Sequence, residues 1–68
     1  MDQLQRQQQI EALVGVALLT SKDLAVRLAE IIAYLQKQEH LAALGALQGT
    51  EEPFRLLQIT LSHAARIT

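Results

Sequence analysis

Residues 51–67, EEPFRLLQITLSHAARI, carry the clearest structural pattern in the sequence. Apolar side chains recur there at steps of three, four and three: Phe54, Leu57, Leu61 and Ala64. Such spacing places them on one face of an α-helix, with the charged and polar residues elsewhere on its surface. The sequence therefore predicts an amphipathic helix over 51–67 that packs one face against a neighbouring element.

The residues just before this helix resemble the signals that end one helix and begin the next. Gly49 suits the left-handed conformation that commonly terminates a helix, and Thr50 is a residue type that caps helix N-termini. Pro53 falls in the first turn, where a missing amide hydrogen costs little. We therefore predict a short connection at 49–50.

A second helix start is predicted at Thr20 and Ser21, because either hydroxyl could cap the turn that follows. Beyond it, apolar residues recur at steps of four, three and four: Leu24, Leu28, Ile31 and Leu35. This is the spacing of a helix-packing stripe. The pattern predicts a helix that begins at residue 21.

Five consecutive polar residues, QKQEH at 36–40, interrupt this apolar pattern before it resumes with leucines. Either the helix bends or breaks there, or it runs straight and its two halves meet different partners. The run contains neither Gly nor Pro, and Gln, Lys and Glu all favour helix. We therefore predict one continuous helix over 21–48.

The first helix is predicted over 2–19 and divides into two parts. Residues 3–9 are rich in glutamine, whereas the remainder carries an apolar stripe: Ile10, Leu13, Val14, Ala17 and Leu18. The predicted fold is thus all-α, a single domain over 1–68. It consists of three helices, 2–19, 21–48 and 51–67, joined by short connections. We expect this unit to assemble into a larger helical bundle, most simply a symmetric dimer.

Length and composition favour such an assembly. A chain of 68 residues buries only about 60% of its unfolded surface, and this one has no cysteine to form a disulfide. The formal net charge of −1 does not favour nucleic acid, and the longest apolar run is far shorter than the ~20 residues of a membrane-spanning helix. We expect a cytoplasmic protein.

The sequence offers little chemistry for catalysis. His40 and His63 lie in different predicted helices, and neither has a cysteine or a regularly spaced carboxylate beside it. The adjacent pair Glu51 and Glu52 is better explained by the positive end of a helix dipole than by acid–base work. We predict no catalytic, cofactor-binding or metal-binding residue, and no enzyme activity.

The apolar stripes exceed what three short helices can cover. We predict that the excess forms an interface with a second copy or with a helical protein partner: Leu41, Leu44, Leu47, Leu56, Ile59 and Ile67. The predicted function is a non-catalytic interaction module, such as a small helical adaptor, chaperone or docking subunit. Its size and helical layout are similar to those of small export chaperones of secretion systems and of docking domains in multienzyme assembly lines.

The alternative is a small dimeric nucleic-acid-binding transcriptional regulator. Residues 21–29, SKDLAVRLA, resemble the first helix of a helix-turn-helix motif. The resemblance implies a tight turn and a basic recognition helix directly after it. Instead, Glu30 to Tyr34 continue the helical pattern, and the next basic residue is Lys37. The interaction module is therefore the favoured hypothesis.

Overall fold

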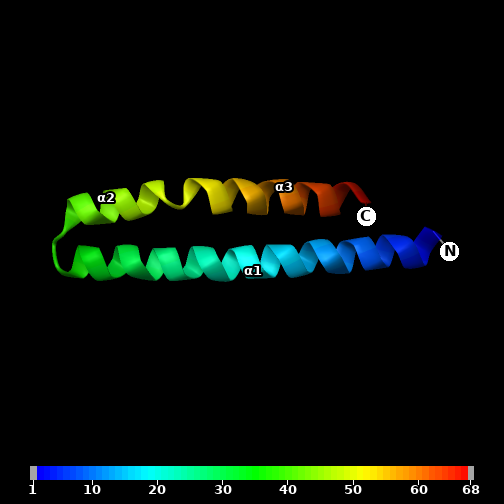
Figure 1. Ribbon diagram of the computed structural model, residues 1–68, viewed down its shortest axis with the longest axis horizontal. Helices are drawn as coiled ribbons and strands as arrows, with labels where there is room; N and C mark the ends of the chain where they lie inside the picture. Colours follow the sequence, from blue (N-terminus) through cyan, green and yellow to red (C-terminus); the bar gives the residue numbers. More distant parts are fainter. Residues whose placement is uncertain (1, 68) are drawn as a thin grey trace.

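The chain folds into a long helical hairpin, as a computed structural model describes it for residues 2–67. Helix α1 spans Asp2–Gln36, α2 spans His40–Gln48 and α3 spans Glu51–Ile67. Figure 1 shows α2 and α3 lying almost end to end, antiparallel to α1, with the turn at one end and both termini at the other. The described residues form no strand, so the all-α prediction is confirmed.

The first two predicted helices have different bounds in the structure. Residues 2–19 and 21–35 belong to one uninterrupted helix, so the predicted start at residue 21 is wrong. Thr20 lies inside α1, where its hydroxyl donates a 2.8 Å hydrogen bond to the Val16 carbonyl. A hydroxyl bonded back to the carbonyl four residues earlier cannot cap a following turn. The fold is therefore two antiparallel arms rather than three separately packed helices.

The break occurs instead in the polar run, where a continuous helix was predicted. Gln38 has a left-handed backbone with φ of 61°. Its amide donates to the Leu35 carbonyl at 3.0 Å, and the Glu39 amide donates to the Tyr34 carbonyl at 2.8 Å. These two bonds make the Schellman motif that ends many helices, with glutamine at the position usually taken by glycine. The turn reverses the chain within residues 37–39.

The connection between α2 and α3 is short, as predicted, but its details differ. Gly49 has φ of −70° and lies in the right-handed region, so the predicted left-handed glycine is wrong. The Thr50 hydroxyl donates to the Leu47 carbonyl at 2.6 Å and so closes the end of α2 rather than capping α3. Helix α3 itself spans the predicted residues.

The two arms meet along a seam with a strict heptad repeat. In α1 the buried and half-buried residues recur at alternating steps of three and four: Ile10, Leu13, Ala17, Thr20, Leu24, Arg27, Ile31 and Tyr34. In the second arm, residues 40–67, they follow the same rule: Ala43, Ala46, Thr50, Pro53, Leu57, Thr60, Ala64 and Ile67. This is the pattern of the a and d positions of a coiled coil.

The core along this seam is thin. Ala17 and Ala43, at 7% and 6% exposed, are the buried apolar side chains of the described residues, and no large side chain is fully buried. The Cα extents are 55 × 14 × 12 Å, and the radius of gyration is 15.9 Å. A compact domain of this length would have a radius of gyration of about 11 Å. The hairpin is therefore a rod that leaves most of its apolar side chains in contact with solvent.

Candidate interaction surface

One long side of the hairpin is apolar along most of its length. Its large side chains come from all three helices and are each between 49% and 59% exposed: Val14, Leu18, Leu28, Ile32, Leu35, Leu44, Leu47, Phe54 and Leu61. We call this set the apolar side. Its residues occupy the e and b positions of the heptads whose a and d positions form the seam.

Two contacts show how the arms are aligned. A Cβ placed on Gly49 would lie 3.1 Å from a terminal guanidinium nitrogen of Arg27, so these two residues are neighbours across the seam. At the open end, a shallow depression is lined by Gln9 and Leu13 of α1 together with His63 of α3. Gln9, Gly49 and His63 all occupy g positions. The g positions of the two arms therefore share one side, and the e positions share the other.

The apolar side carries very little charge. Over residues 14–35 and 44–61, its e and b positions hold one ionisable side chain, that of Glu51. Small residues such as Ser21 and Ala25 occupy the places between the large apolar ones. The result is a strip along both helical arms that carries one carboxylate, that of Glu51, and is otherwise uncharged.

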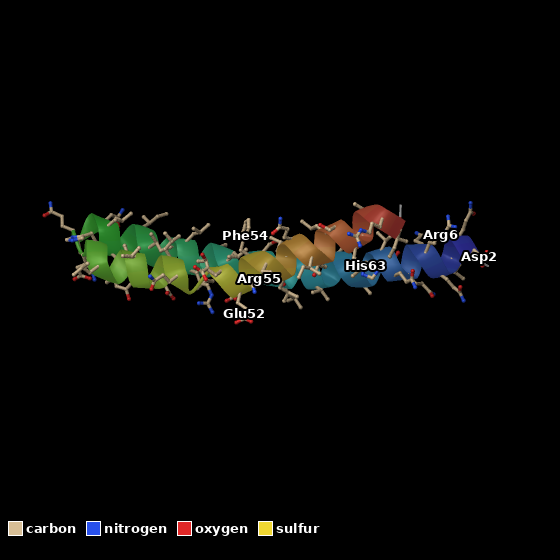
Figure 2. All side chains as sticks on the ribbon, turned by 90° about the horizontal axis from the view of Figure 1, so that it is seen from above. Asp2, Arg6, Glu52, Phe54, Arg55 and His63 are labelled. Carbon is tan, nitrogen blue, oxygen red and sulfur yellow. The ribbon has the colours of Figure 1, made fainter. Side chains whose placement is uncertain are left out.

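The opposite side, which we call the mixed side, holds charged residues among apolar ones: Leu19, Asp23, Val26, Glu30, Glu52, Leu56, Ile59, His63 and Arg66. Figure 2 shows Phe54 and Glu52 projecting from opposite long sides of the hairpin. At the border of the mixed side with the seam, the Arg27 guanidinium donates to the Asp23 carboxylate at 3.3 Å, as the four-residue spacing predicts. Solvent reaches both side chains, so the pair adds little to stability.

The six residues predicted as an interface fall in different places. Leu44 and Leu47 belong to the apolar side, whereas Leu56 and Ile59 lie on the mixed side. Leu41, 73% exposed, faces outward beside the turn. Ile67 is half-buried in the seam, in a depression that it shares with Ile10. The structure thus does not gather these six residues on one surface.

The sequence pattern assigned several residues of the apolar side to the core. Leu28, Phe54 and Leu61 were predicted to face a neighbour within the chain, but each is about half exposed. The seam instead takes the residue before each of them: Arg27, Pro53 and Thr60. Ala17, Thr20 and Arg27 occupy successive a and d positions, and this shared spacing was the signal that separates the seam from the apolar side. A hydrophobicity pattern does not reveal it, because these three residues are small or polar.

The ionisable residues are dispersed. His40 begins α2 beside the turn, whereas His63 lies near the open end of the hairpin. Within residues 2–67, no three histidine or carboxylate side chains lie close enough together to hold a metal ion. None of the helices described is long and apolar enough to cross a membrane.

The helix-turn-helix resemblance ends where the structure would need a turn. Residues 21–29 lie in the middle of α1, and the helix continues without interruption to Gln36. The turn at 37–39 is followed by α2, which is nine residues long and contains no lysine or arginine. A basic recognition helix therefore does not follow this segment.

Comparison with protein-family models, with curated proteins and with solved structures gave no match for this chain.

Proposed function

We propose that the protein is a non-catalytic interaction module whose hairpin is completed by another helical polypeptide packed on its exposed apolar surface. The observation that supports this is the imbalance between core and surface. Within residues 2–67 no large side chain is fully buried, while leucine, isoleucine and phenylalanine side chains line the outside. Contiguous apolar surface of this kind marks protein interaction sites in soluble proteins.

The form of the surface indicates the kind of partner. Its apolar residues follow helix axes and recur at steps of three, four and seven, which is the arrangement that receives another amphipathic helix. A role as a small adaptor, chaperone or docking subunit uses such a surface directly. A second copy of the chain is the simplest partner, because every copy carries the surface that needs to be covered.

Dilution of the pure protein tests this function. We would measure molar mass by light scattering and helix content by circular dichroism over a wide concentration range. We expect either an oligomer that loses helix as it dissociates or a partly unfolded monomer that needs its partner. A monomer that stays fully helical, with a melting temperature independent of concentration, would contradict the proposal.

A further inference from the structure

We propose that the apolar side is the contact between two copies of this chain, which pack their hairpins face to face into a four-helix bundle. This inference rests on the proposed function and adds to it the surface and its occupant. Three features of the hairpin support it: its excess surface area, the position of its apolar stripes and the width of its apolar side.

The surface area is larger than a compact monomer would expose. The hairpin has 5532 Å² of accessible surface, whereas a folded monomer of 7.5 kDa is expected to expose about 4,200 Å². The excess of about 1,300 Å² is greater than the ~800 Å² that each partner buries in a stable interface of standard size. One face-to-face contact therefore needs less area than the hairpin has in excess.

The apolar stripes are rotated away from the seam toward the apolar side. In a helical pair that is complete by itself, the large apolar residues occupy the a and d positions. Here the d positions include Arg27, Pro53 and Thr60, and the e position that follows each of them holds a large apolar residue: Leu28, Phe54 and Leu61. Along α1 the strongest stripe consists of a and e residues: Leu24, Leu28, Ile31 and Leu35. A helix whose apolar residues extend from a to e packs against a neighbour on that side as well.

The width and charge of the apolar side favour a second hairpin over a single foreign helix. Residues from both arms contribute, so a single helix would cover only part of the strip. A second hairpin presents two helices at the same spacing and covers both. Because the strip is nearly uncharged, it can meet its own copy around a two-fold axis without setting like charges against each other.

The experiment compares one substitution at two positions of α1. Leu28→Lys places a charge on the apolar side, and Leu19→Lys places the same charge on the mixed side, where Leu19 is 70% exposed. We expect the unmodified protein and Leu19→Lys to have a molar mass twice 7.5 kDa by light scattering at tens of micromolar. Leu28→Lys should associate at least about 100-fold more weakly, since it would bury an unpaired charge.

A second measurement applies if Leu28→Lys fails to fold. The chain has no cysteine, so Leu28→Cys and Leu19→Cys each introduce a single thiol. We expect iodoacetamide to alkylate the thiol at position 28 at least about tenfold more slowly in concentrated than in dilute protein, as expected for a site covered by association. The thiol at position 19 should react at the same rate in both.

Each other result overturns the inference in a distinguishable way. An oligomer that is dissociated by Leu19→Lys but not by Leu28→Lys would place the contact on the mixed side and leave the proposed function intact. A partly unfolded monomer at all concentrations would replace the second copy by a foreign partner. A stable helical monomer would overturn both this inference and the proposed function.

Discussion

Two of the buried side chains in the seam are threonines. Thr20 and Thr60 are 8% and 6% exposed, and each hydroxyl donates to the carbonyl four residues earlier in its own helix. Each side chain thus satisfies its polar group locally and needs no partner across the seam. Threonine and alanine are small, and the buried side chains of α1 are those of Ala17 and Thr20, so the helices can approach closely along this part of the seam.

The expected result of enlarging one of these residues follows from that packing. Thr60→Leu should lower the free energy of unfolding by about 1–3 kcal/mol, because there is no space for the longer side chain between the arms. Thr60→Val keeps the shape of the side chain and removes only the hydroxyl that bonds to the Leu56 carbonyl, so the free energy of unfolding should change by about 1 kcal/mol at most. Urea unfolding followed by circular dichroism, at one protein concentration, measures both. Ser62→Leu, at an exposed position of α3, is the control, and an equal loss there would contradict a tight seam.

At the level of elements, the turn between the arms depends on one strained residue. Gln38 adopts φ of 61°, a conformation that costs a side-chain-bearing residue roughly 1 kcal/mol and glycine almost nothing. Gln38→Gly should therefore raise the free energy of unfolding by up to about 1 kcal/mol. Gln36→Gly, two residues earlier in the helical part of α1, should lower it by about 0.5–1 kcal/mol. Thermal melts of the two variants should shift in opposite directions, and shifts of the same sign would contradict the Schellman motif.

The same turn shows how far the sequence predicts the elements. Helix α3 is predicted correctly because its start carries two glutamates and a proline, which act over one turn of chain. The break at 37–39 is not predicted, because residues 36–40 include good helix formers and the left-handed position holds glutamine. The polar run at 36–40 was the available signal. It is longer than one helical turn, and a helix that packs against a neighbour along its whole length needs an apolar residue in every turn.

The prediction of a helix start at residue 21 fails because a local signal is present but tertiary packing outweighs it. Ser21 and Asp23 are typical of helix N-termini, but Thr20 bonds to the carbonyl of Val16, and the chain on both sides has apolar residues in one heptad phase. Continuous packing along the whole second arm outweighs a local capping preference of about 1 kcal/mol. Local signals are decisive only where tertiary packing does not oppose them.

For the whole molecule, the sequence predicts the excess of apolar surface but not its location. A stripe of leucines has the same spacing whether it lies at d or at e, so Leu28 and Leu61 look like core residues. The choice is made by the rotation of each arm about its own axis, which turns Arg27 toward Gly49 of the other arm. That rotation depends on contacts between segments distant in sequence, and several of the residues that it brings into the seam are small or polar.

The nearly uncharged apolar side also determines how the assembly should respond to salt. Charges on the two copies would be screened over about 10 Å at 0.1 M salt, whereas burial of apolar surface is not weakened by sodium chloride. We expect the dissociation constant of the oligomer, measured by sedimentation, to change less than about threefold between about 50 and 500 mM sodium chloride.

A nucleic-acid complex held by six or more phosphate contacts would instead weaken about 10³-fold or more between 50 and 200 mM salt. Self-association that fails at high salt would show that ion pairs, such as those available on the mixed side, hold the copies together. A shift of duplex DNA at low ionic strength would favour the nucleic-acid alternative, since the net charge of −1 gives no general attraction to phosphate.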